Sequence, residues 1–182
     1  MSDRPGTTVA VILRKRRTAS RWQAWQWELE DVVPHEPTYG NEARRLYQGE
    51  DGERWLHPGL RVELFRDEAE GYHLNVTTPA PCWFVMWRMG EGSDEGEPIA
   101  RPVVVTLSYH EAARWLDAQE TVEQVPAPPD VVEWMRAFAQ EHYELEPKKR
   151  KRPESFRRLE DRFGQPASVS TGKKSGGGEG NG

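Results

Sequence analysis

The sequence predicts an α+β domain: a mostly antiparallel sheet or partly open barrel of about seven strands, packed by two C-terminal helices. Three observations lead to this fold class. Residues 82–89 are apolar on both sides of an extended chain, segments before and after them alternate apolar and polar residues, and the spacing becomes helical after Ser108. A basic tail, which we expect to be disordered, follows the domain.

The segment at residues 82–89 is the strand around which the core is expected to form. Its two alternating sets are Trp83, Val85, Trp87 and Met89 on one side and Cys82, Phe84 and Met86 on the other. Pro81 before it and Gly90 after it favour a strand over a helix, because they mark its two ends. A strand that is apolar on both sides belongs inside a sheet with both faces covered.

Two strands are predicted at the N-terminus. The first covers residues 7–13, which are rich in β-branched side chains, and a cationic connection at residues 14–21 follows it. The second covers residues 22–33. Its buried side is expected to carry Trp25, Trp27, Leu29 and Val33. The polar residues between them make this a strand with one solvent-exposed side.

Further strands are predicted on both sides of the central one. Residues 44–47 and 54–56 indicate a short hairpin, and residues 60–65 indicate a strand that turns back through a left-handed Gly71. The returning strand is expected to point Tyr72, Leu74 and Val76 inward. The acidic loop at residues 90–97 is expected to be mobile, and residues 101–107 form the last strand.

Two helices complete the predicted domain. Ser108 and Glu111 have the spacing of a capping box, in which each residue bonds the amide of the other, and the helix that they begin ends near Ala118. The second helix begins at Pro129 and ends before Pro147. Its apolar stripe consists of Val131, Trp134, Met135, Phe138, His142 and Leu145.

Charge divides the chain into an acidic body and a basic tail. The 182 residues carry a net charge of −5, and residues 147–182 contain ten Lys and Arg against four Asp and Glu. We therefore expect one domain at residues 1–146, with a charge of −11, and a largely disordered tail in which residues 154–163 can form one or two helical turns. The acidic body has no broad basic face, which argues against nucleic acid as the partner.

No catalytic set emerges from the residues. The chain has one cysteine and five scattered histidines, so it has no metal-ligand spacing. Cys82 and His73 can meet on neighbouring strands as nucleophile and base, but a buried, inert cysteine is the favoured interpretation. We expect a non-enzymatic protein without metal or cofactor. No run approaches the roughly 18 apolar residues of a membrane span, and a cytoplasmic location is expected.

Two cationic features are the candidate binding sites. The first is a patch of cations beside an aromatic side chain, which can hold an anionic ligand or partner or can simply be a solvated loop. It consists of Arg14, Lys15, Arg16, Arg17, Arg21 and Trp22. The second is the basic run of the tail, which can bind an acidic surface or serve as a solubilising tail. It consists of Lys148, Lys149, Arg150, Lys151 and Arg152, followed by Phe156.

Several stretches, taken in order, resemble a bacterial family of unknown function, DUF3305. They are Arg21-Trp22-Gln23, Tyr72-His73-Leu74-Asn75, Pro81 to Val85, Val105 to Ala112, Val125 to Pro129, Val132-Glu133-Trp134 and His142-Tyr143, and the resemblance covers residues 7–146. None of these stretches is a catalytic signature.

The resemblance implies a function only through gene neighbourhood. Genes of this family tend to lie beside those of molybdenum-dependent formate dehydrogenases and their maturation factors. This implies an accessory or assembly module that binds a formate dehydrogenase subunit or a maturation factor. The alternative is a regulatory module that binds a small anionic ligand or nucleotide through Arg21 and Trp22.

Overall fold

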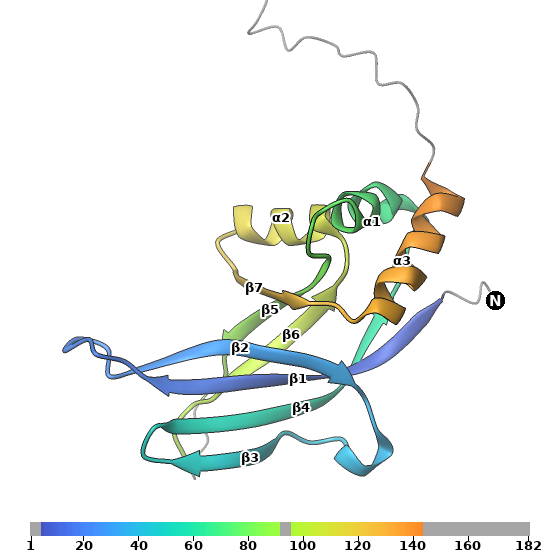
Figure 1. The fold of residues 1–182 in the computed structure, drawn as a ribbon. Coiled ribbons are helices and arrows are strands. Elements are labelled where there is room, and N and C mark those ends of the chain that lie inside the picture. Colours follow the sequence, from blue (N-terminus) through green and yellow to red (C-terminus); the bar gives the residue numbers. More distant parts are fainter. Residues whose placement is uncertain (1–4, 92–95, 144–182) are drawn as a thin grey trace, which may run out of the picture. The chain divides into compact units, whose positions relative to one another are not determined.

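Two antiparallel sheets and three α-helices make up the part of the chain that the computed structural model describes, residues 5–91 and 96–143 (Figure 1). Sheet A contains, in spatial order, β2 (Trp25–Pro34), β1 (Gly6–Arg17), β4 (Gly52–Glu63) and β3 (Arg44–Gly49), and sheet B contains β6 (Ala100–Thr106), β5 (Cys82–Met89) and β7 (Thr121–Pro126). The α-helices are α1 (Ala69–Val76), α2 (Tyr109–Asp117) and α3 (Pro129–His142), and short 3-10 helices lie at Pro37–Tyr39 and Arg66–Glu68. The predicted α+β class is confirmed, with two open sheets in place of a partly open barrel.

The central strand β5 is covered on both faces, as its sequence predicts. It lies between β6 and β7, and residues 82–86 are all buried. Trp83 and Val85 join the main core with side chains of sheet A, while Cys82 and Phe84 pack with Ala112 of α2. Sheet B is therefore a middle layer between sheet A and the helices α1 and α2 (Figure 1).

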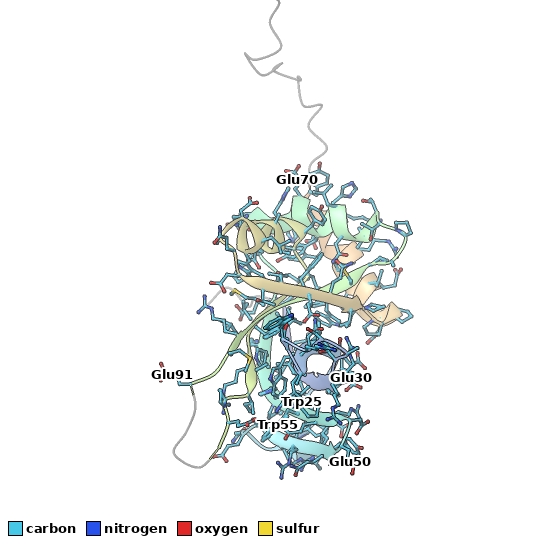
Figure 2. The ribbon with its side chains drawn as sticks, turned by 90° about the vertical axis from the view of Figure 1, so that its left-hand side faces the viewer. Trp25, Glu30, Glu50, Trp55, Glu70 and Glu91 are labelled. Atoms are coloured by element: carbon cyan, nitrogen blue, oxygen red, sulfur yellow. The ribbon has the colours of Figure 1, made fainter. Side chains whose placement is uncertain are left out.

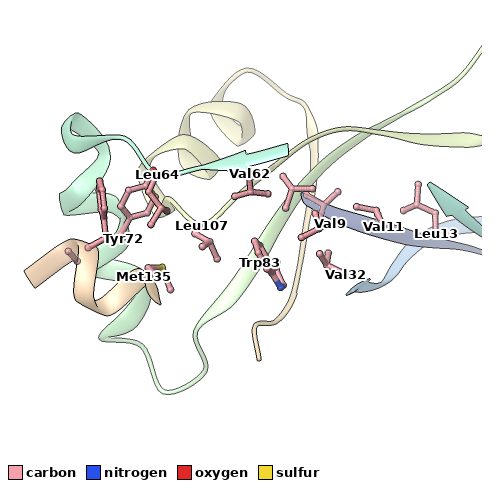
Figure 3. Close-up of a cluster of buried hydrophobic side chains, with 14 of the residues drawn as sticks. Val9, Val11, Leu13, Val32, Val62, Leu64, Tyr72, Trp83, Leu107 and Met135 are labelled. Atoms are coloured by element: carbon pink, nitrogen blue, oxygen red, sulfur yellow. The ribbon is translucent and has the colours of Figure 1, made fainter. Parts of the chain in front are cut away.

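The main core lies between the two sheets and α3. Figure 3 shows side chains of β1 facing Trp83 of β5, with Leu107 and Met135 continuing the cluster toward α1. Met135 is completely buried, and Phe138 is buried one helical turn further on, so the predicted stripe of α3 faces inward as far as it is described; Leu145 lies outside the described residues. The β-branched residues of β1 provide flat apolar walls that suit this sheet packing.

The returning strand predicted at Tyr72, Leu74 and Val76 is wrong, because these residues belong to helix α1. The buried residues are Ala69, Gly71, Tyr72 and Asn75, of which Ala69, Tyr72 and Asn75 follow a helical spacing, whereas Leu74 is exposed. Gly71 is helical rather than left-handed. A side chain at this position would collide with Oγ of Ser108, so glycine allows α1 to approach the start of α2.

Sheet A also differs from the prediction in three ways. β1 continues through the expected cationic connection to Arg17, and β4 is one strand where two were expected. The register between β1 and β2 shifts between Ile12 and Leu13, so that no residue of β1 lies opposite Glu30. This shift reverses the alternation of β2, so that Val32 is the deeply buried residue where Val33 was expected.

The strand β7 was not predicted. It pairs antiparallel with β5 along its whole length, from Pro126 opposite Cys82 to Thr121 opposite Trp87. Its sequence ends in Pro126, which disfavours a strand, and polar residues interrupt its alternation, so the local signal for a strand is weak. Tertiary pairing with β5 decides its conformation.

The side-chain amide of Asn75 connects α1 to both neighbouring layers. Its Nδ2 donates to the carbonyls of Cys82 and Leu107, each at 2.8 Å, and lies 3.5 Å from Sδ of Met135. Its Oδ1 accepts the amide of Cys82 at 3.0 Å. Asn75 is buried, so these bonds satisfy polar groups that water does not reach.

Ser108 begins α2 as predicted, but only half of the capping box forms. Its Oγ accepts the amide of Glu111 at 3.2 Å, while its own amide donates to Oγ1 of Thr106 rather than to Glu111. The hydroxyl of Ser108 also donates to Glu68 at 2.5 Å, and Arg114 donates to the same carboxylate. Glu68 therefore ties the start of α1 to α2.

The remaining sequence predictions concern residues 92–95 and 144–182, which lie outside the described residues. They include half of the acidic loop, the basic tail and the turns at residues 154–163. The described residues belong to one compact unit, Met1–Glu144. Among them, no helix has both the length and the apolar character that crossing a membrane requires.

His57 lies buried where β4 meets β6. Burial, and secondly the positive charge of Arg101, lower the pKa of His57 from the usual 6.5 to about 4, although a hydrogen bond to the Ala100 backbone opposes the shift. Its Nε2 has no hydrogen-bond partner among the described residues. The neutral imidazole is thus the form that the fold accommodates.

We expect Asn75→Ala to lower the free energy of unfolding by at least about 3 kcal/mol, because it leaves the amide of Cys82 and the carbonyl of Leu107 buried and unpaired. Chemical denaturation measures this value. Thr77→Ala is the matched control: it removes one exposed side-chain bond to the Leu74 carbonyl near the end of the same helix. A loss below about 1 kcal/mol for Asn75→Ala would contradict the connecting role.

We also expect His57 to make stability depend on pH. Above pH 6.5 the residue is neutral in both states, and its full contribution is present. As pH falls toward 4 the unfolded chain binds the proton first, so the free energy of unfolding decreases by about 3 kcal/mol in total. Denaturation of wild type and His57→Gln between these pH values isolates this loss; parallel curves for the two proteins would refute it.

Candidate functional site

The β1–β2 hairpin ends in a loop, residues 18–24, that we call the hairpin tip. The Thr18 amide donates to the Ala24 carbonyl at 2.9 Å, and the Thr18 hydroxyl donates to the Gln23 carbonyl. The Trp22 amide donates to Oγ of Ser20 at 3.3 Å. These bonds close the loop on itself, yet the Trp22 side chain is 96% exposed. The tip therefore holds a large indole in solvent.

The cations of the predicted patch do not gather around Trp22. Arg14 and Arg16 lie on one side of β1 and both approach Glu28, at 3.7 and 3.1 Å. Lys15, on the other side, pairs with Glu97 at 3.2 Å. Only Arg17 and Arg21, both exposed, have no carboxylate partner among the described residues. In the structure, three cations of the patch thus form ion pairs, and the two arginines nearest the tip are left without a carboxylate.

The aromatic partner of these cations is Trp25. The ammonium of Lys15 lies 5.1 Å from its ring centre and the guanidinium of Arg17 lies 5.7 Å from it. Arg17 pairs directly with Trp25 in the β1–β2 register, which places both side chains on the same side of the sheet. The sequence prediction missed this contact because it ended the first strand at Leu13.

A groove with a volume of about 880 Å³ lies beside sheet A and the residues that precede β6. Its lining includes Trp27, Trp55 and Arg45 of sheet A together with Glu97 and Arg101. Arg45 lies 5.8 Å from the ring centre of Trp55, whose Nε1 donates to Glu53 at 2.9 Å. Figure 2 shows Trp25 and Trp55 on sheet A, with Glu91 beyond the end of β5. Charges of both signs line this groove.

A smaller cavity of about 410 Å³, which we call the tryptophan slot, lies where β2 meets β5 and β7. Three indoles, one thioether and a single charged side chain line it. The lining residues are Gln23, Trp25, Gln26, Trp27, Trp87, Met89, Thr121 and Glu123. Gln23 belongs to the hairpin tip, so the slot and Trp22 are neighbours along the chain.

Glu123 of β7 holds the two sheets together beside the slot. Its Oε2 accepts Nε1 of Trp87 at 2.6 Å and the backbone amide of Leu29 at 2.8 Å. Leu29 lies at the register shift of β2, so its amide is turned toward β7. The sequence prediction missed Glu123 because it missed β7, and no local pattern marks this residue.

The possible nucleophile–base pair of Cys82 and His73 does not form. Burial raises the pKa of the Cys82 thiol to about 11, and its Sγ lies 4.0 Å from Oδ1 of Asn75. The ring of His73 instead stacks on Tyr143, with 4.6 Å between centres. Within residues 5–91 and 96–143, no group of three or more His, Cys, Asp or Glu side chains is arranged to hold a metal ion.

The second candidate feature of the sequence, the basic run at residues 148–152 with Phe156, lies outside the described residues. The hairpin tip, the tryptophan slot and the larger groove together form the candidate binding region of the described chain. Trp25 and Trp55, which line the slot and the groove, lie on sheet A away from Glu70 of helix α1 (Figure 2). Indoles line both cavities, with charges of both signs in the groove and one carboxylate in the slot.

Comparison with known proteins gives a family but no described function. No curated protein and no solved structure matches the chain. A family model described as "Protein of unknown function (DUF3305)" matches residues 8–152, which includes the basic run at residues 148–152. The match covers most of the chain and contains the hairpin tip, both sheets and all three α-helices, so the chain belongs to the DUF3305 family.

Proposed function

We propose that this protein is a non-catalytic accessory module that binds a protein partner through the hairpin tip. The observation that carries the proposal is the exposure of Trp22 in a loop that its own hydrogen bonds close. Tryptophan is enriched at binding hot spots because it buries a large area with little loss of conformational freedom. A closed loop lowers the ordering cost of binding further.

The charges near the tip define the kind of surface that fits it. Arg17 and Arg21 are exposed and lack carboxylate partners among the described residues, while the remainder of the body is acidic. A partner with carboxylates around an apolar pocket would satisfy both arginines and the indole. Such an interaction should weaken as the salt concentration rises.

The partner that we propose is a subunit of a molybdenum-dependent formate dehydrogenase, or a factor that matures it. The support is the gene neighbourhood that the family resemblance implies, together with the absence of a catalytic set among the described residues. The alternative, an anion or nucleotide site at Arg21 and Trp22, is less favoured. Neither residue lines the larger groove or the tryptophan slot, and two exposed side chains enclose no small ligand.

We expect the double variant Arg21→Glu with Trp22→Ala to weaken partner binding by at least about 30-fold, because it removes a hot-spot indole and reverses a steering charge. Affinity is measured by calorimetry with the purified partner subunit at several salt concentrations. Arg61→Glu with Leu116→Ala is the matched control, since it changes an exposed arginine and an exposed apolar residue elsewhere. Equal affinities for the two double variants would overturn the proposal.

We expect deletion of the gene to lower formate dehydrogenase activity, most strongly under limiting molybdate. Activity is measured in cell extracts of the native host, with complementation by wild type and by the hairpin-tip double variant. Restoration by wild type and incomplete restoration by the variant would support the assignment. A deletion strain with full activity under limiting molybdate would rule out the accessory role.

A further inference from the structure

We propose that the tryptophan slot receives an arginine or lysine side chain of the protein partner. This assignment rests on the proposed function for the source of the side chain, while its chemistry follows from the slot alone. The slot lies beside the hairpin tip, because Gln23 lines it and Trp22 is the adjacent residue. A partner that covers Trp22 therefore has its surface close to the slot.

The walls of the slot suit a cation on an aliphatic stem. Trp25, Trp27 and Trp87 contribute indoles, whose faces attract ammonium and guanidinium groups more strongly than other aromatic rings do. Met89, half-exposed at the end of β5, offers a flexible thioether against which a methylene chain can pack. The volume of about 410 Å³ is ample for one long side chain.

The charge of the slot is negative and uncompensated. Glu123 is the only charged residue in the lining, and it forms no ion pair among the described residues. Its Oε2 is occupied by the indole of Trp87 and the amide of Leu29, and these two bonds fix the carboxylate in place. Its Oε1 makes no hydrogen bond with the described residues. A fixed carboxylate with one open oxygen, surrounded by indoles, is complementary to a cationic donor.

Contacts between a cation and an indole ring already occur on the same face of sheet A. Lys15 and Arg17 lie over Trp25, and Arg45 lies over Trp55. None of these three cations lines the tryptophan slot, so they leave its space and its carboxylate unclaimed. The larger groove differs in this respect, because Lys15 and Glu97 form an ion pair within its lining.

The first test needs no partner. N-acetylargininamide is titrated into the full-length protein, and tryptophan fluorescence and the indole N–H signals are followed; N-acetylcitrullinamide, which has the same shape without the charge, is the matched probe. We expect millimolar binding of the arginine probe and at least about tenfold weaker binding of the citrulline probe. No binding of the arginine probe, or equal binding of both, would overturn the cationic assignment.

Two variants locate the binding. In Glu123→Gln the amide oxygen still accepts the bonds from Trp87 and Leu29, so the melting temperature should stay near that of wild type. The substitution removes the negative charge and the open acceptor oxygen, so probe binding should fall at least about tenfold. Met89→Lys leaves Glu123 untouched and should also abolish binding by placing an ammonium in the slot. Glu141→Gln, an exposed change of equal charge on α3, is the control. Unchanged probe binding in both slot variants would refute the site.

The second test separates the two proposals. Glu123→Gln should weaken binding of the partner subunit about tenfold beyond any effect of Glu141→Gln. If the arginine probe binds the slot but Glu123→Gln leaves partner affinity unchanged, the partner does not supply the side chain, and this inference fails while docking through Trp22 stands. If the hairpin-tip variant binds the partner as wild type does, the proposed function fails while the probe result still assigns the slot to cations.

Discussion

The buried amide of Asn75 is the interaction on which the arrangement of the layers depends. It holds the first residue of β5 and the Leu107 carbonyl just after β6, and it contacts Met135 of α3. Because a carboxamide has a fixed separation between donor and acceptor, these segments have little freedom to slide past one another. The direction in which β5 leaves the helices is thereby set.

That direction determines where the proposed binding residues lie. β5 begins at Cys82, which Asn75 of α1 holds, and ends at Met89, which lines the tryptophan slot beside sheet A. There Glu123 accepts bonds from Trp87 and Leu29 and joins sheet B to sheet A. The Asn75 junction is saturated with hydrogen bonds, whereas the Glu123 junction leaves a carboxylate oxygen open. The structural role and the proposed binding role are consequently separated along one strand.

The sequence predicts the parts of the fold that local patterns encode. The doubly apolar β5 and the stripe of α3 are strong signals because each repeats over a whole element, and the serine cap of α2 is recognisable because its two residues lie three positions apart. The strand predicted at residues 72–76 was wrong because Tyr72 and Asn75 are buried by contacts with Phe65, Cys82 and Leu107, which lie outside the segment and which its own pattern does not encode. β7 and the bulge of β2 likewise depend on tertiary pairing.

The candidate site was predictable only in part, for the same reason. The concentration of arginines next to Trp22 is visible in the sequence, but the ion pairs with Glu28 and the stacking on Trp25 follow from the register of β1 and β2.

The central claim is that binding takes place at the hairpin tip and the tryptophan slot. Hydrogen–deuterium exchange of the full-length protein, free and bound to the partner, tests it most directly. Protection on binding at residues 18–24, 87–89 and 121–123, with α1 and α2 unchanged, is the predicted result; protection at α1 and α2 with none at the hairpin tip would contradict it.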